Sequence, residues 1–434
     1  MTHWMRWTMS LFALLGLIGC SVVPGGPSGV KAAVVTSDKA RERDPDADLA
    51  DVRALAEGNT AFALDLYRQL LEDAGDDNLF YSPHSIAIAL SMTYAGAEGE
   101  TAEQMAETLH IPLPESQYYA AFNRLDLLLA GRGEGAEGKD DEGFRLNVVN
   151  ALWGQQGYAF LSAFLDTLAE NYGAGLRTLD FESDPEGARR TINAWVSDQT
   201  EGRIEDLIPQ GVLTALTRLV LTNAIFFNAA WAEPFNAELT EDAPFTLLDG
   251  SEISVPMMRK TTRYAYAEGE GYQAVALPYD GNELSMLVVL PEAGTLETYE
   301  SGLSVAGLNE IVDRLQAQSV ALTMPRFETR SAFSLVDALE ALGMEDAFSQ
   351  DDADFSGMTE KRELYITEVV HEAFVSVDEK GTEAAAATAV VMTLRSAAPI
   401  EPVEMRIDHP FLIFIRDTET GAVLFVGRIV DPSG

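Results

Sequence analysis

One segment near the carboxyl end constrains the fold most strongly, because it joins a strand pattern to a long run of small residues. Residues 371–379 alternate with a period of two, which is typical of a buried strand. Gly381 follows, and its missing Cβ permits a chain reversal that other residues resist. Residues 382–389 contain no large side chain. The pattern predicts a strand, a small-residue hinge and an exposed loop that presents the Arg395–Ser396 bond, although an alanine-rich run alone also suits a helical turn or a linker.

Composition limits the classes of partner. The chain has 434 residues, of which 47% are hydrophobic, so it can bury a large core. It carries 29 basic and 69 acidic residues, a formal net charge of -40. Nucleic acid, anionic polysaccharide and anionic lipid surfaces would repel such a protein. The acidic residues are spread along the chain, which indicates a solvated surface rather than an acidic binding site.

The amino terminus is predicted to be an export signal. An apolar run from Leu11 to Ile18 follows basic residues and is short for a membrane-spanning helix. It ends at Cys20, the only cysteine, in a sequence that resembles a bacterial lipobox. We expect residues 1–19 to be a signal peptide, Cys20 to be lipidated, and residues 20–54 to be a flexible tether before a domain at 55–434. The alternative is an ordinary signal peptide with an incidental cysteine.

The rest of the chain predicts a mixed α and β protein. Apolar spacing predicts helices at 61–71, capped by Asn59 or Thr60, and after Ser82, with a third at 101–109 in which Thr101 and Gln104 form a capping box. Strand-like runs occur at residues 146–152, 219–227, 284–290, 321–327, 364–370, 411–415 and 423–429. The last two are joined by a hairpin signal ending at Gly421. Helices first and strands later favour one large α+β domain.

Two motifs suggest chemistry that their surroundings exclude. Residues 133–138 match G-x-G-x-x-G, but acidic neighbours would repel phosphate and no strand precedes them. His371 and Glu372 begin like a zinc-protease helix, yet no second histidine follows at the required spacing. The chain also lacks a G-x-S-x-G nucleophile turn. We therefore expect no metal, no cofactor and no enzymatic activity.

Motifs along almost the whole chain resemble those of the serpin family. The first matching motifs are residues 78–92 and 96–101, which resemble the N-terminal helices of the family. The hinge described above is among the last. The other matching segments, in family order and spacing, are residues 192–208, 221–227, Trp231, 234–235, 255–258, 325–327 and 408–411. The resemblance covers about residues 55–432 and implies the serpin fold, with N-terminal helices, several sheets including a large central one, and an exposed reactive-centre loop.

The resemblance implies that the partner of this chain is a target protease and that the mechanism is suicide inhibition. The protease cuts the loop, and the released hinge inserts as an extra strand while the acyl-enzyme is still attached. A strand exposes alternate residues on one face, so six residues would share the buried face. These are Thr382, Ala384, Ala386, Thr388, Val390 and Met392. None is charged and none is proline, which favours an inhibitor.

Family spacing from Glu379 places the scissile bond at Arg395–Ser396, within one residue. Arginine suits a protease whose primary pocket holds a carboxylate, so we expect a trypsin-like serine protease as the target. A register shift by one would place Leu394 there and favour chymotrypsin-like or subtilisin-like enzymes. A lone solvated loop cation is the simpler structural interpretation of Arg395.

Further positions match family sites that control strand opening. Ser82, Ser85, Asn223 and His371 match a polar cluster beneath the point where the central strands part. Trp231, Arg326 and Glu379 match the place where insertion begins, and we expect Arg326 and Glu379 to pair. The simpler interpretations are a hydrogen-bonded core histidine, a core tryptophan and a surface ion pair.

The leading hypothesis is an exported, lipid-anchored, monomeric inhibitor of trypsin-like serine proteases. One alternative is a non-inhibitory serpin-fold binding protein whose loop is only a substrate. Another is a cross-class inhibitor of cysteine or subtilisin-like proteases. No basic helix suggests a heparin-type cofactor.

Overall fold

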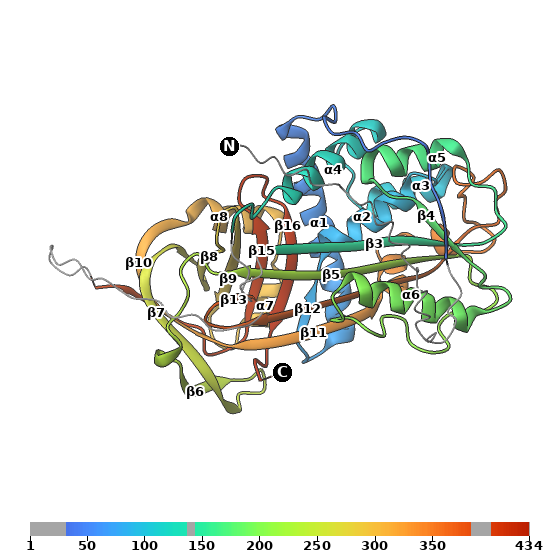
Figure 1. The fold of residues 1–434 in the computed structure, drawn as a ribbon. Helices are drawn as coiled ribbons and strands as arrows, with labels where there is room; N and C mark the ends of the chain where they lie inside the picture. Colours follow the sequence, from blue (N-terminus) through green and yellow to red (C-terminus); the bar gives the residue numbers. More distant parts are fainter. Residues whose placement is uncertain (1–31, 137–143, 383–400, 434) are drawn as a thin grey trace, which may run out of the picture.

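The computed structural model describes residues 32–136, 144–382 and 401–433, which form two large β-sheets and their covering helices (Figure 1). The helices are α1 (Leu49–Ala74), α2 (Pro83–Tyr94), α3 (Gly99–Thr108), α4 (Glu115–Ala130), α5 (Ser162–Thr167), α6 (Pro185–Gln199), α7 (Leu296–Ser301), α8 (Val305–Arg314) and α9 (Val336–Ala341). A π-helical turn, η1 (Leu168–Tyr172), continues α5, and short 3-10 turns lie at Ala237–Leu239 and Asp346–Phe348.

The first sheet, called the central sheet below, has the strand order β1-β4-β3-β5-β13-β12-β11. Its strands are β1 (Ala33–Val35), β3 (Arg145–Gln155), β4 (Leu176–Leu179), β5 (Leu219–Ala230), β11 (Phe327–Ser334), β12 (Ile366–Val377) and β13 (Gly381–Thr382). The long strands β3, β5, β12 and β11 run side by side in Figure 1. β5 pairs in parallel with β12 over most of its length, whereas β3 and β11 pair antiparallel to their neighbours.

The second sheet has the order β14-β10-β7-β8-β9-β15-β16-β2, with β6 paired to β7. Its strands are β2 (Leu79–Tyr81), β6 (Glu241–Thr246), β7 (Glu252–Gly269), β8 (Tyr272–Pro278), β9 (Leu284–Pro291), β10 (Gln316–Pro325), β14 (Val403–Arg406), β15 (Phe411–Asp417) and β16 (Val423–Ile429). β14 follows the predicted loop region directly and pairs in parallel with β10.

The central sheet is covered on both faces. On one face, α6 packs Ile192 and Val196 into a compact cluster with Trp153 of β3. On the other face, α2 packs against β3 and β5 and belongs to the main core. α2 is apolar around most of its circumference and almost entirely buried, as expected for a helix between two sheets. This arrangement places the amino end of α2 directly under the centre of the sheet.

The predicted α+β class is confirmed, and most predicted strands lie within a few residues of observed ones. The hairpin is confirmed too, since β15 and β16 pair across a turn in which Gly421 has a φ of 80°. The single strand predicted at 321–327 is wrong, because β10 ends at Pro325 and β11 starts at Phe327 in the other sheet. Arg326 lies at this switch between sheets.

The predicted capping box at Thr101 is also wrong. α3 starts two residues earlier, at Gly99, so Thr101 lies inside its first turn. The Thr101 hydroxyl instead accepts a 2.9 Å hydrogen bond from the Asp354 amide. Gln104 likewise accepts a 2.8 Å bond from the Asp346 amide. Both side chains join α3 to a distant loop rather than to its own backbone.

The predicted boundary at residue 55 differs from the structure. It falls inside α1, which begins at Leu49 and is capped by Asp48 rather than by Asn59 or Thr60. Residues 33–35 form strand β1, so the second half of the predicted tether belongs to the folded unit. The sequence signal was weak because a three-residue strand has too few positions to show a period. Within the part of the chain that the structure describes, no helix has the length and apolar character needed to cross a membrane.

Candidate functional site

The candidate site is the seam between β5 and β12, the two parallel strands at the centre of the central sheet. Pairing runs from Leu219 and Ile366 at one end to Ile225 and Ala373 at the other. Above that point the strands part, and β13 lies between them, antiparallel to both. Two residues of the predicted hinge, Gly381 and Thr382, therefore lie in a strand position at the open end of the seam.

Gly381 is at the tightest point of this arrangement. The chain reverses between β12 and β13, with the Asp378 amide donating a 3.0 Å bond to the Gly381 carbonyl. A Cβ on Gly381 would collide with the backbone of β5, lying 2.7 Å from the Cα of Ala230. The reversal predicted for Gly381 is thus present, and close approach to β5 is the reason that glycine is required.

Aromatic side chains hold the turn that leads into β13. Trp231 is 3% exposed, and its indole N–H donates a 2.9 Å hydrogen bond to the carbonyl of Asp378. Its ring stacks on Tyr279, with centroids 4.8 Å apart. The Tyr279 hydroxyl lies 2.9 Å from the hydroxyl of Thr382, which is fully buried. Trp231 therefore contacts the turn, and Tyr279 contacts the side chain of Thr382 in β13.

The expected pairing of Arg326 with Glu379 is present. Arg326 donates two hydrogen bonds to one Glu379 oxygen, at 2.6 and 2.8 Å. Thr240 donates a third hydrogen bond to the same carboxylate. Burial alone would raise the pKa of Glu379, but the hydrogen bonds from Arg326 and Thr240 outweigh it and hold that pKa below its usual value. The carboxylate ties the turn to the junction between the two sheets.

A buried polar cluster lies under the closed part of the seam. His371 of β12 hydrogen-bonds Asn223 of β5, directly across the seam. Asn223 in turn donates a 2.5 Å bond to the Ser85 hydroxyl of α2. The backbone N–H of Ser82, the cap residue of α2, donates a 3.1 Å bond to His371 Nε2. The structure thus brings together all four residues that the sequence analysis grouped, Ser82, Ser85, Asn223 and His371.

These contacts define where the protons lie. His371 Nε2 accepts from the Ser82 amide, so Nδ1 carries the proton and donates to Asn223. Burial lowers the pKa of His371 to about 3, so the ring is neutral near pH 7. The cluster joins two strands and a helix by hydrogen bonds without burying a charge.

Sequence reasoning missed three members of the site. Asn150 of β3 accepts a hydrogen bond from Asn223 and another, 3.1 Å long, from the Ser85 hydroxyl. These bonds extend the cluster to a third strand. Tyr279 and Thr240 contact the hinge as described above. Asn150 was detectable as a polar residue inside an apolar strand run, whereas Tyr279 and Thr240 lie in segments with no distinguishing pattern.

Several predicted site residues lie outside the described part of the chain. They are Cys20, Ala384, Ala386, Thr388, Arg395 and Ser396. Of the hinge residues, the structure places Glu379, Gly381 and Thr382.

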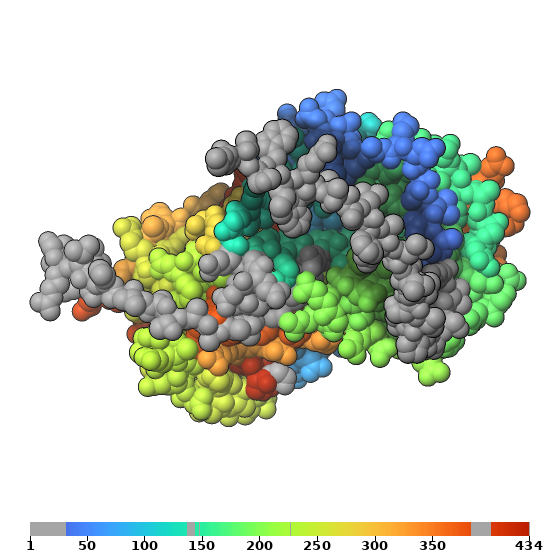
Figure 2. Space-filling view, viewed as in Figure 1, coloured from blue at the N-terminus to red at the C-terminus, as the bar shows by residue number. Residues whose placement is uncertain are grey.

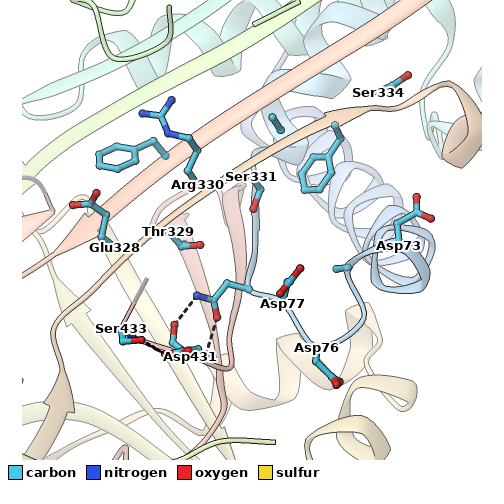
Figure 3. A pocket seen from close by; sticks show the side chains of 15 residues that line it. Asp73, Asp76, Asp77, Glu328, Thr329, Arg330, Ser331, Ser334, Asp431 and Ser433 are labelled. Atoms are coloured by element: carbon cyan, nitrogen blue, oxygen red, sulfur yellow. Dashed lines mark hydrogen bonds between the residues drawn. The ribbon is translucent and has the colours of Figure 1, made fainter. Parts of the chain in front are cut away.

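A broad groove of about 1120 Å³ borders β11, the strand at the edge of the central sheet (Figure 3). Its walls include Asp73, Asp76, Asp77 and Asp431. Arg330 is turned toward β12, where it pairs with Glu372. β12 separates this groove from the seam, and none of the hinge contacts described above involves a residue of the groove.

Replacement of Glu379 by Gln should loosen the turn, because the Arg326 guanidinium would then donate to a neutral amide oxygen instead of a carboxylate. We expect Glu379→Gln to lower the free energy of unfolding by about 1–2 kcal/mol in urea titrations. Glu328→Gln removes an exposed carboxylate from the neighbouring strand and serves as the matched control. Equal effects of the two substitutions would show that the pair does not stabilise the hinge.

The buried His371 should make stability fall in mild acid. Its folded pKa is below the ordinary value of 6.5, so between pH 6.5 and about 3 the unfolded chain binds a proton that the folded chain does not. Unfolding therefore becomes more favourable as pH falls, by about 1.4 kcal/mol per pH unit from this group. Titrations at several pH values should give a shallower acid dependence for His371→Gln than for the unmodified chain. His110→Gln, at an exposed histidine, is the control. If the unfolding free energy of His371→Gln depends on pH as steeply as that of the unmodified chain, His371 is not the source of the acid dependence.

Comparisons with known proteins agree with this geometry. The family model described as "Serpin (serine protease inhibitor)" matches residues 57–432. A serpin-like protein from Thermococcus kodakarensis is 41% identical over 377 residues, covering 86% of this chain and 84% of that protein. Human leukocyte elastase inhibitor is 38% identical over 387 residues, covering 87% and 99%.

Solved structures give the same result. Uncleaved ovalbumin aligns with a TM-score of 0.76 at 28% sequence identity, covering 87% of this chain and all of ovalbumin. Human thyroxine-binding globulin aligns with a TM-score of 0.78 at 31% identity, covering 88% and 99%. The family match over most of the chain, the similarity of the relatives and the fold agree, and the chain belongs to the serpin family.

Proposed function

We propose that the chain is a suicide-substrate inhibitor of trypsin-like serine proteases, which traps the acyl-enzyme by inserting its cleaved loop into the seam. The observation that carries the proposal is the position of β13. Gly381 and Thr382 already pair with β5 and β12, and the residues that follow them in the sequence are small. Insertion would extend an existing strand rather than start a new one.

The register of β13 predicts where each further residue would lie. Gly381 is opposite Ala230 and Thr382 opposite Ala229, so the inserting chain descends β5 one residue at a time. Continued in this way, Thr388 comes opposite Asn223. The register with β12, set by Thr382 opposite Val377, places Thr388 opposite His371 as well. The two strands agree, so Thr388 would lie between the pair of residues that now closes the seam.

The same register sets the length of the inserted strand. Met392 would come opposite Leu219, the first residue of β5. Side chains alternate along a strand, so even-numbered residues from Thr382 to Met392 would face the α2 side, where Asn223 and His371 lie. All of them are uncharged. Insertion would replace a parallel pairing by two antiparallel ones, which adds backbone hydrogen bonds and favours the inserted state.

Target choice in this proposal depends on the loop. Arg395 is the only basic residue between Gly381 and Glu404, in a chain of net charge -40. A protease whose primary pocket holds a carboxylate would select it. We also propose that the protein is exported and acts as a monomer held to a membrane by lipid on Cys20, a location suited to extracellular proteases.

Incubation with a panel of proteases tests the function. The full chain in mild detergent should form a denaturant-resistant complex with trypsin-like enzymes, and mass spectrometry should show release of a peptide beginning at Ser396. Arg395→Ala should reduce trypsin-family inhibition by at least a hundredfold, because the primary contact is lost. Cleavage without a complex would instead favour the non-inhibitory alternative. A complex formed only with cysteine or subtilisin-like proteases would favour cross-class inhibition.

A charge at Thr388 should separate cleavage from inhibition. Thr388→Glu would place a carboxylate between Asn223 and His371, at a cost of several kcal/mol in a buried site. We expect cleavage by the target at the normal rate, but little covalent complex and no gain in heat resistance. Ala398→Glu adds the same charge beyond the scissile bond and should inhibit normally. Full complex formation by Thr388→Glu would refute the projected register.

A further inference from the structure

The segment just before α1 lies outside the part of the chain matched by the family model, which begins at residue 57. Residues 33–44, here called the N-terminal strap, nevertheless make specific contacts. In Figure 1 the blue trace runs from the start of α1 past α5 to β4, and Figure 2 shows blue residues on the molecular surface at this side. The strap therefore links the edge of the central sheet to the helices.

The first part of the strap adds a strand to the central sheet. β1 pairs antiparallel with β4, with Ala33 opposite Thr178 and Val35 opposite Leu176. Gly175, just before β4, lies directly against the strap. A Cβ on Gly175 would lie 2.6 Å from the Thr36 side chain and 2.8 Å from the Val35 carbonyl oxygen. The three nearest atoms to that Cβ all belong to the strap.

The second part of the strap is fastened to α4 and η1. Arg41 donates hydrogen bonds to Asn123 of α4 at 2.8 Å and to Asp126 of α4 at 2.5 Å. The Glu42 amide donates a 2.9 Å bond to the Glu170 carbonyl of η1. The side chain of Asn123, fully buried, returns a 2.8 Å bond to the Glu42 carbonyl.

Additional contacts come from exposed and partly exposed groups nearby. The Ser37 hydroxyl donates to Asp166 of α5. Lys39 pairs with Glu170 at 2.9 Å, and the hydrogen bond and charge of Glu170 raise the pKa of Lys39. Exposed pairs of this kind contribute little by themselves, so Arg41 and the strand pairing carry the attachment.

Opening of the seam moves one side of the sheet relative to the other. Insertion between β5 and β12 separates β1, β4, β3 and β5 from β12 and β11 by about one strand spacing, roughly 4.8 Å. α4 packs on α1, and α1 packs on β16 of the second sheet. The strap connects β4, on the moving side, to α4, on the helical scaffold. Its contacts consequently oppose the displacement.

We propose that the N-terminal strap is a built-in restraint on strand insertion, which slows conversion of the intact, uncleaved protein to an inactive loop-inserted form. The proposal rests on the insertion mechanism of the proposed function and concerns its regulation. The strap acts through β4 on the closed seam and touches none of the hinge residues.

Two single substitutions in the full chain test the restraint. Gly175→Ala pushes Val35 and Thr36 away from β4, and Arg41→Ala removes the bonds to α4. Each variant is held below its unfolding temperature. Nicking of residues 383–400 by thermolysin, a zinc metalloprotease that forms no acyl-enzyme, is read by mass spectrometry and reports the fraction with an accessible loop. We expect both variants to lose accessible loop at least fivefold faster than the unmodified chain, with a matching gain in heat resistance.

Matched controls separate the restraint from general loss of stability. Arg43→Ala changes an exposed arginine two residues from Arg41, and Gly302→Ala adds a methyl at ordinary contact distance, 3.5 Å from the Tyr299 carbonyl. Both should convert at the unmodified rate. Ile311→Val in α8 lowers stability through the core, far along the chain from the strap.

Three outcomes would overturn the strap proposal. The first is a conversion rate in Gly175→Ala and Arg41→Ala equal to that of the unmodified chain. The second is an equally accelerated conversion in Ile311→Val when its melting temperature equals that of the strap variants. The third is the absence of conversion in every variant. The assay contains no target protease. The conversion rates can therefore be interpreted even if the protein inhibits no protease. A chain that inhibits proteases while its strap variants convert normally would refute the strap alone.

Discussion

β5 and β12 pair in parallel at the centre of the central sheet, and both the buried polar cluster and the hinge contacts are arranged around this pairing. Because β5 and β12 run in the same direction, a strand placed between them can pair antiparallel with both. The chain supplies the start of that strand immediately after β12, because Gly381 reverses direction against the backbone of β5. One wall of the seam, β12, and the short strand β13 beside it thus belong to one continuous segment, whereas the other wall, β5, comes from much earlier in the chain.

The two ends of the seam are held by different chemistry, for a physical reason. Asn223 and His371 lie in the interior, where an unpaired charge would cost several kcal/mol, and they are joined by neutral hydrogen bonds shared with α2. Glu379 lies at the open end, where Arg326 is partly solvated, and a charged pair is tolerated there. In the proposed insertion, these neutral hydrogen bonds would be replaced by bonds to Thr388, and no buried ion would be left unpaired.

Much of the fold was predictable from local pattern, and the failures have identifiable causes. The alternation in 371–379 predicted a strand through its period of two. The apolar runs of β9, β15 and β16 are continuous instead, as expected for strands that are buried on both faces. The run at 321–327 misled because strand-like residues continue on both sides of Arg326, so the pattern does not reveal that the chain passes from one sheet to the other there. β1 was missed because three residues carry no period, and its strand character depends on contact with β4.

The hinge could be recognised from local sequence alone, because a strand period is followed by one glycine and a run of small residues in which only Glu383 is charged, and the family resemblance supplied its meaning. Only the tertiary structure decided what those residues meet. Asn150, Asn223, Ser85 and His371 come from three strands and a helix, and hydrogen-bond geometry between such distant segments is set by packing rather than by sequence pattern. The attachment of the strap to β4 and α4 was decided in the same way, because a short strand acquires its partners only when the sheet edge and the helix are already in place.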